Sequence, residues 1–279
     1  MKIVAVFNCD SWLMSSFGGN KLRNSWSFFH PDIPIVWYNE NYTNRIILQN
    51  PGFELTSFMP IIMKEVKETY KADLVIKLDA DSIVLSRLDE ILEGDYEIAG
   101  CRNDGDHAKG DESNNRPISI KNLSRELYMS CGCIATTSDQ FLDDWYNLNK
   151  DTIEKYGSLY PHIPMAEQGS YNIIYHSGKY KTKILDEING NLHYGASANM
   201  PSPNKRKIPK HIIKEYGCSI WQSWKDIKYK NGKFWLYGKN VKIIHQAGGG
   251  NPLTCKKLQW DMFNPQVVFK LKEITQCNE

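Results

Sequence analysis

Strand-like and helix-like segments alternate through the first half of this chain, and this alternation is the feature that most constrains its fold. Buried strands are expected at residues 2–7, 34–38, 74–78 and 96–100. Helices are expected between them, around Leu22 to Phe29 and over 61–70, and a strand at 133–137 precedes helices at 139–148 and 167–176. Such a pattern is typical of an α/β protein with parallel neighbouring strands. We therefore predict a mixed, mostly parallel central sheet flanked by helices.

Length and composition limit the classes of protein to which this chain can belong. A chain of 279 residues can form one large domain or two small ones, and we expect a single elaborated domain. With 41% hydrophobic and 24% charged residues and a net charge of +2, nothing indicates a nucleic-acid partner. No apolar stretch is long enough for a membrane span. The seven scattered cysteines indicate reduced thiols and a cytoplasmic protein.

An acidic motif, Asp79-Ala80-Asp81, directly follows the apolar run Leu74 to Leu78. In an extended chain the side chains at i and i+2 share a face, so both carboxylates are expected to reach one object. Carboxylate oxygens suit Mg²⁺ or Mn²⁺, and a site with few protein ligands leaves positions for substrate phosphates. The alternative interpretation is a solvated acidic turn.

Near the other end of the chain, a strand is expected to place His245 before a glycine-rich turn at Gly248 to Gly250. Successive glycines let backbone amides approach a ligand closely, and concave runs of N–H groups bind anions. A histidine at the end of a strand also occurs as an ordinary core residue. Its pairing with an acidic motif and with the glycines favours a metal ligand.

Two polar stretches, 102–116 and 199–210, are predicted to be long loops. A loop of this length inside a compact domain is often a lid or a binding loop, although it can also be plain solvent-exposed chain. The second stretch carries four basic residues, Lys205, Arg206, Lys207 and Lys210. They could bind a diphosphate, or they could simply be solvated surface charges.

Several segments together resemble one enzyme family. Asp79-Ala80-Asp81 is similar to the DxD motif of GT-A glycosyltransferases, and the segment 245–252 resembles the HxxGxxKP segment of glycosyltransferase family 8. The segments 167–172 and 130–134 are similar to the DQDxxN motif of that family and to the strand before it. They follow the family's order from the first strand to Pro252.

The resemblance implies a GT-A (Rossmann-like) transferase that uses a UDP- or GDP-sugar and a glycan or glycoconjugate acceptor, with retention of configuration. It implies a Mn²⁺ or Mg²⁺ ion held by Asp79, Asp81 and His245. Donor contacts would come from Asp79, Ala80, Gly248 and Asn251. Glu167 and Gln168 would face the anomeric carbon, from the beginning of a helix.

Two departures from the family motifs concern the donor. Asn251 stands where the family has a lysine, for which Lys256 or Lys257 would have to substitute. Gly169 replaces the second acid of the DQDxxN motif, so the transferred sugar is expected to differ from the usual glucose or galactose, with pentose or deoxysugar donors as candidates.

Other site residues follow from the expected sheet. Ligands of open α/β sheets bind at the carboxyl ends of the strands, so we expect Phe7, Asn8 and Cys9 near the nucleotide base. Lys64 is expected to reach the donor from the helix over 61–70. If the enzyme inverts configuration instead, Glu167, Asp144 or Asp186 would serve as the general base. Glu167 also suits a helix cap.

The predicted catalytic domain covers residues 1–255, with a nucleotide-binding half at 1–101, an acceptor half at 102–255 and a tail at 256–279. Two alternatives stay open. One is a carbohydrate-binding or degenerate transferase fold without turnover, in which Trp221, Trp224 and Trp235 stack on sugars. The other is a haloacid-dehalogenase-type phosphatase, although its signature usually lies on the first strand and Ile83 occupies its threonine or valine position.

Overall fold

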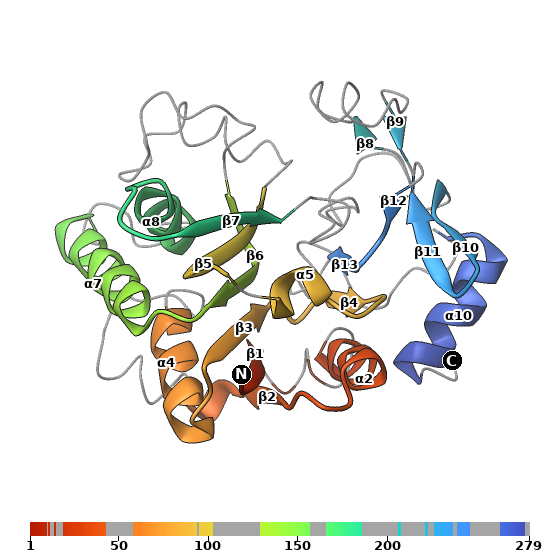
Figure 1. The fold of residues 1–279 in the computed structure, drawn as a ribbon, viewed down its shortest axis with the longest axis horizontal. Coiled ribbons are helices and arrows are strands. Elements are labelled where there is room, and N and C mark those ends of the chain that lie inside the picture. The colour runs from red at the N-terminus through yellow and green to blue at the C-terminus, as the bar shows by residue number, and fades with distance from the viewer. Residues whose placement is uncertain are drawn as a thin grey trace. The chain divides into compact units, whose positions relative to one another are not determined.

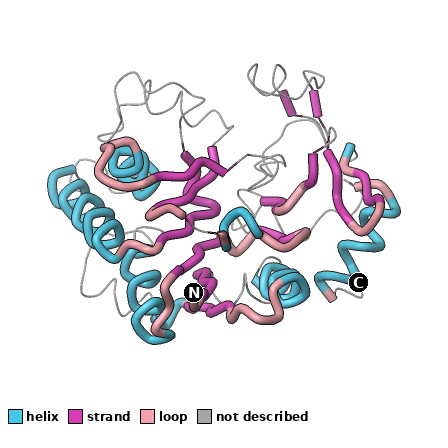
Figure 2. The backbone as a smooth tube through the Cα atoms, viewed as in Figure 1, coloured by secondary structure: helices cyan, strands magenta, loops and turns pink. Residues whose placement is uncertain are grey.

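The computed structural model describes the parts of the chain that are coloured in Figure 1 and are not grey in Figure 2. Contacts between residues divide the chain into two compact units, Met1–Cys9, Val36–Leu78 and Ile91–Ile184 in the first and the remaining segments in the second. The described residues are 1–9, 11, 14, 19–42, 58–93, 95–102, 129–156, 166–185, 206–207, 221–222, 226–236, 239–245 and 263–276.

The first unit is built on a six-stranded sheet with the order β2-β1-β3-β6-β5-β7. β1 (Ile3–Asn8) and β3 (Leu74–Leu78) are parallel, with Val4 opposite Val75. β6 (Met129–Thr136) is antiparallel to both of its neighbours, β3 and β5 (Ile98–Arg102), so β1, β3 and β5 run the same way. β2 (Ile35–Tyr38) and β7 (Thr182–Leu185) form the edges. The predicted mixed, mostly parallel sheet is confirmed.

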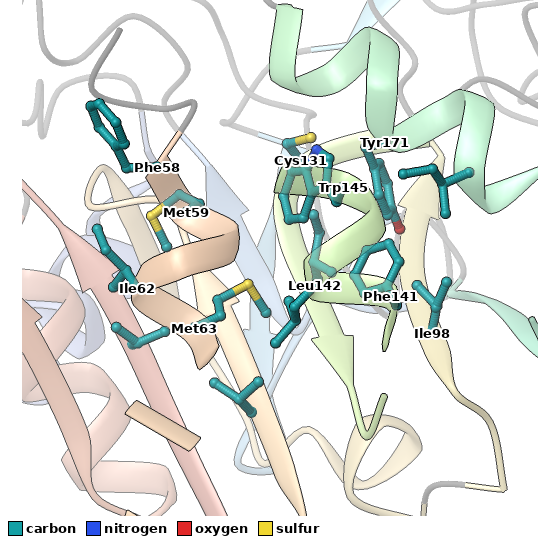
Figure 3. Packing of buried hydrophobic residues seen from close by; sticks show 14 of the residues in the cluster. Phe58, Met59, Ile62, Met63, Ile98, Cys131, Phe141, Leu142, Trp145 and Tyr171 are labelled. Atoms are coloured by element: carbon teal, nitrogen blue, oxygen red, sulfur yellow. The ribbon is translucent and has the colours of Figure 1, made fainter. Parts of the chain in front are cut away.

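Three helices pack on one face of this sheet, namely α4 (Met59–Tyr70), α7 (Asp139–Tyr156) and α8 (Ala166–Tyr175) (Figure 1). Their apolar sides enclose a cluster that includes Met63, Trp145 and Tyr171 (Figure 3). Ser138 caps α7, because its Oγ accepts a hydrogen bond from the Phe141 N–H at 3.2 Å. This cluster is the core that positions β6 and the first turn of α8.

The second unit contains α2 (Gly19–Phe29), β4 (Ser82–Val84) and β13 (Ile243–His245), and the short helix α5 (Asp89–Leu92) begins in it. It also contains a sheet of β10 (Lys228–Lys230), β11 (Lys233–Leu236) and β12 (Lys239–Asn240). The turn between β10 and β11 is Asn231-Gly232, both with positive φ, the arrangement that favours a tight hairpin. A short pair joins β8 (Arg206–Lys207) to β9 (Trp221–Gln222).

Helix α10 (Pro265–Thr275) lies in the segment predicted as a tail. The Asn264 side chain caps it by accepting from the Val267 N–H at 3.1 Å, and Pro265 suits its first turn. The Asn24 amide of α2 donates to the Thr275 carbonyl at 3.0 Å, so α10 packs against α2 within the second unit. The division into a domain over 1–255 and a tail stays a prediction.

Two further properties concern the cellular setting. In the described part of the chain, no helix combines the length and the apolar character needed to cross a bilayer. Four of the described cysteines are buried free thiols, Cys9, Cys101, Cys131 and Cys133.

Candidate functional site

The acidic motif forms a turn between β3 and β4. The Ser82 N–H donates to the Asp79 carbonyl at 3.0 Å, which closes the chain segment from Asp79 to Ser82. Asp79 and Asp81 are both partly exposed, whereas Ala80 and Ser82 are buried. The predicted extended conformation of these residues is therefore wrong, because the strand ends at Leu78. Asp79 is instead the first residue of a tight turn, and Asp81 is its third.

His245 lies beside this turn in the backbone ladder of the second unit. β13 is antiparallel to β4, with Ile243 opposite Val84 and His245 opposite Ser82. Opposed Cα atoms in such a ladder are about 5.5 Å apart or closer, and consecutive Cα atoms are about 3.8 Å apart. The Cα atoms of His245 and Asp81 are therefore at most about 9 Å apart. The register brings the two predicted ligand segments together.

The side chains of Asp79, Asp81 and His245 are ligand types that suit a hard or borderline divalent cation. Two carboxylates suit Mg²⁺ or Mn²⁺, and an added imidazole favours Mn²⁺. The imidazole of His245 lies outside the described side chains, and among those that are described no group of three acidic, histidine or cysteine residues forms a metal site. Gly248 and Asn251, predicted to contact the donor, also lie outside the described residues.

Glu167 and Gln168 occupy the first turn of α8 in the first unit, and both are buried. Asn172 fixes this helix to β6 because its side chain donates to the Met129 carbonyl at 2.9 Å and accepts from the Met129 N–H at 2.7 Å. The Trp145 indole donates to the Glu167 carbonyl at 2.9 Å. The backbone at the beginning of α8 is thus anchored to both β6 and α7.

The predicted nucleotide-base residues end β1 in the first unit. Phe7 is fully buried and Cys9 is 3% exposed, so of these residues only Asn8 presents a partly exposed side chain. The backbone of Cys9 is fixed to β2, since its N–H donates to the Tyr38 carbonyl at 3.2 Å and its carbonyl accepts from the Trp37 indole at 2.9 Å. A contact between the base and this strand end stays a prediction.

Lys64 is placed by an ion pair within the first unit. Its Nζ lies 2.6 Å from Oδ1 of Asp143 on α7, and the two hydrogen bonds to that carboxylate raise the pKa of Lys64. Lys67, on the same side of α4, donates to Asp139 of α7 at 2.6 Å. Both lysines therefore join α4 to α7, and a contact of Lys64 with the donor stays a prediction.

Asp144, one of the alternative general bases, already accepts hydrogen bonds from neighbouring side chains. Burial raises the pKa of its carboxyl, but hydrogen bonds from Lys179 at 2.5 Å, Tyr180 at 2.5 Å and Gln140 at 2.9 Å lower it overall. A carboxylate held by three donors is a weak base. Asp186, the other alternative, lies outside the described residues.

Sequence reasoning missed one residue in this region. Lys77 is the fourth residue of β3, is 5% exposed and donates through Nζ to the Cys131 carbonyl of β6. The signal was present in the sequence, because Lys77 interrupts an otherwise apolar run directly before the acidic motif. A buried lysine is rare unless it has a specific partner.

Comparisons with known proteins identify the fold. No protein-family model and no curated protein matches the chain. Among solved structures, the bifunctional glycosyltransferase WbbM matches with a TM-score of 0.50 at 13% identity over 100% of this chain and 50% of its own. The galactosyltransferase LgtC, solved with donor and acceptor sugar analogues, matches with a TM-score of 0.49 at 14% identity over 99% of this chain and 95% of its own.

The glycosyltransferase GlyE of Streptococcus pneumoniae TIGR4 matches with a TM-score of 0.42 at 17% identity over 68% of this chain and 46% of its own. This chain thus spans about half the length of GlyE and WbbM. At such low identities the likeness concerns the fold. The chain has the GT-A fold of glycosyltransferases.

Proposed function

We propose that this protein is a metal-dependent glycosyltransferase that moves a sugar from a UDP- or GDP-sugar to a hydroxyl group of a glycan or glycoconjugate, with retention of configuration. In this reaction the bond between the anomeric carbon and the diphosphate oxygen breaks, and its electron pair leaves with the diphosphate. The acceptor oxygen forms the new bond to the anomeric carbon, and its proton passes to the departing phosphate oxygen.

The observation that carries this proposal is the register of β4 and β13, which sets His245 opposite Ser82, next to Asp81. Asp79, Asp81 and His245 are the proposed ligands of Mn²⁺ or Mg²⁺. A divalent cation there would stabilise the negative charge of the leaving diphosphate. Asp79 and Asp81 belong to one hydrogen-bonded turn, so the backbone that carries both carboxylates is already ordered before the metal and diphosphate bind.

The roles of the remaining residues rest on the family motifs and, for Asn8, on its place at the carboxyl end of β1. Glu167 and Gln168 are proposed to face the anomeric carbon, and Asn8 the nucleotide base. The donor sugar is proposed to differ from the usual hexoses of the family because Gly169 stands in the place of an acid. A cytoplasmic location is proposed from the buried free thiols, since such cysteines persist in a reducing compartment.

The test is a panel of UDP- and GDP-sugars incubated with the protein in the presence of Mn²⁺ or of EDTA. The proposal predicts release of nucleoside diphosphate from at least one donor with Mn²⁺, and none with EDTA. An intact panel with sugar binding preserved would instead identify a carbohydrate-binding protein. Phosphate release from p-nitrophenyl phosphate, with every sugar nucleotide intact, would identify a phosphatase.

A further inference from the structure

β6 carries an irregularity opposite the end of β5. Gly100 of β5 pairs with Ile134, but its neighbour Cys101 pairs with Ser130, so extra residues of β6 lie between the two pairs. On the other side, β3 pairs with β6 only from Cys133 onward. Cys131 and Gly132 therefore belong to no ladder pair in the described sheet. Bulges of this kind often lie beside functional sites, where they redirect side chains.

Backbone groups that leave a ladder in a dry interior need other partners. The Cys131 N–H donates to Oε1 of Gln168 at 3.2 Å, and the Cys131 carbonyl accepts from Nζ of Lys77. The Gly132 N–H donates to Oγ of Ser130 at 2.9 Å. Cys131 itself is 6% exposed and belongs to the same packed cluster as Trp145 (Figure 3). Side chains from β3, from α8 and from β6 itself are thus the hydrogen-bond partners of these backbone groups.

This arrangement fixes the orientation of the Gln168 amide. A backbone N–H can be met only by an acceptor, so Oε1 must face Cys131 and Nε2 must face the opposite way. Nε2 has no hydrogen-bond partner among the described residues, although Gln168 is only 4% exposed. A buried amide group without a partner costs free energy, which makes it a candidate for binding a ligand.

We propose that Lys77 is a positioning residue for the transfer step, acting on Gln168 through the backbone of Cys131. This inference rests on the proposed function, in which Gln168 faces the anomeric carbon. Lys77 and Gln168 both bind the backbone of Cys131, Lys77 at its carbonyl and Gln168 at its N–H. Without the Lys77 donor, the Cys131 carbonyl loses this partner in the core, the bulge shifts, and the Gln168 amide loses its fixed orientation.

The chain offers a matched control for Lys77. Lys67 of α4 is 8% exposed, belongs to the same unit and donates to a backbone carbonyl, that of Thr137, at 2.5 Å. Its carbonyl partner, Thr137, follows the end of β6, whereas Gln168 accepts from Cys131 near the beginning of that strand. A general loss of stability from replacing a buried lysine would therefore appear in both variants, whereas a positioning effect would appear only at Lys77.

The experiment compares Lys77→Met and Lys67→Met in the panel assay, at a temperature where both variants are folded. Lys77→Met is expected to lower kcat about 10- to 100-fold, with an unchanged KM for the sugar nucleotide, since small misplacements cost this much. Lys67→Met is expected to keep kcat within about twofold of wild type, since this lysine lies outside the contact. An unchanged kcat in folded Lys77→Met would overturn the proposal.

A double variant tests the route of the effect. Gln168→Ala alone is expected to lower kcat, and adding Lys77→Met is expected to cause no further loss, because the residue through which Lys77 acts is already absent. Multiplicative losses in the double variant would contradict the proposed route.

Hydrogen exchange in the protein without nucleotide separates this inference from the proposed function. Lys77→Met should raise the exchange rate of the Cys131 amide, and Lys67→Met should not. Unchanged exchange at Cys131 would overturn the positioning role even if wild type is active. Absence of turnover in wild type, with raised exchange in Lys77→Met, would refute the transferase while the Lys77 contact stands.

Discussion

Ser82 and His245 are cross-strand partners in the antiparallel ladder of β4 and β13. The ladder continues beyond them, since the Leu85 N–H donates to the Lys242 carbonyl at 2.8 Å. Val84 is fixed further by its N–H, which donates to Oγ of the buried Ser25 at 3.0 Å. A slip by one residue would move every side chain of a strand to the other face. These contacts hold the histidine segment in register with the acidic turn.

Gly100 is required by close packing on β5. A Cβ atom at this position would lie 2.1 Å from Oη of Tyr171, a fully buried side chain. Gly100→Ala is therefore expected to lower the free energy of unfolding by about 1–3 kcal/mol, the usual cost of overpacking. Denaturation with urea measures this change.

The matched control for Gly100→Ala removes the clashing atom. Burial raises the pKa of the Tyr171 hydroxyl, which has no hydrogen-bond partner among the described residues. Tyr171→Phe should thus alter the free energy of unfolding by less than about 1 kcal/mol, and in the double variant it should recover part of the loss. Purely additive effects would show that Gly100 has another role.

His30 makes the stability of the second unit depend on pH. Its Nε2 accepts from the Leu88 N–H at 3.0 Å, and the ring stacks on Trp26 with centroids 4.1 Å apart. Burial, and then the charge of Arg87, lower the pKa of His30 from 6.5 to about 4. Because the unfolded chain binds a proton below pH 6.5 and the folded protein does not, the stabilisation is lost as the pH falls.

The corresponding measurement is the free energy of unfolding at pH 7 and pH 4. Between these values wild type should lose about 3 kcal/mol more than His30→Gln, whose amide oxygen can still accept from the Leu88 N–H. Equal pH dependence in the two proteins would show that His30 is protonated in the folded state.

The two lysines of α4 should differ in their effect on stability. The Lys67 side chain is 10% exposed, pairs with Asp139 and also donates to the Thr137 carbonyl. In the other pair, the side chains of Lys64 and Asp143 are 35% and 43% exposed. Lys67→Met should lower the free energy of unfolding by about 1–3 kcal/mol, because the Thr137 carbonyl loses the donor that the buried lysine supplies. Lys64→Met should change it by less than about 1 kcal/mol, as for other exposed pairs. A larger effect at Lys64 would reverse this assignment.

Local patterns in the sequence predicted much of the fold. The apolar run at 74–78 matches β3 at both ends, and α7 begins at Asp139 as expected. Asn231-Gly232 is a further local signal, since this dipeptide favours a tight hairpin turn and forms the one between β10 and β11. The bulge at Cys131 could not be predicted, because it depends on how β3 and β5 align with β6.

The candidate site was predictable to a similar degree. The acidic motif and His245 were identified from their residue types, but the turn at Asp79 to Ser82 was read as extended chain. The ladder between β4 and β13 joins residues that are distant in sequence, and local patterns contain no information on such pairing. The partner of Lys77 could not be predicted for the same reason, since Cys131 lies on another strand.

The most direct test of the central claim is the melting temperature of wild type and Asp81→Ala, measured with UDP or GDP in the presence and absence of Mn²⁺. Asp89→Ala is the control, because it removes an exposed carboxylate of the same unit. We predict that nucleotide and Mn²⁺ together raise the melting temperature of wild type and Asp89→Ala, because ligands that bind the folded state stabilise it. We predict no such increase in Asp81→Ala. An equal increase in Asp81→Ala, or none in wild type with either nucleotide, would contradict the proposed metal site.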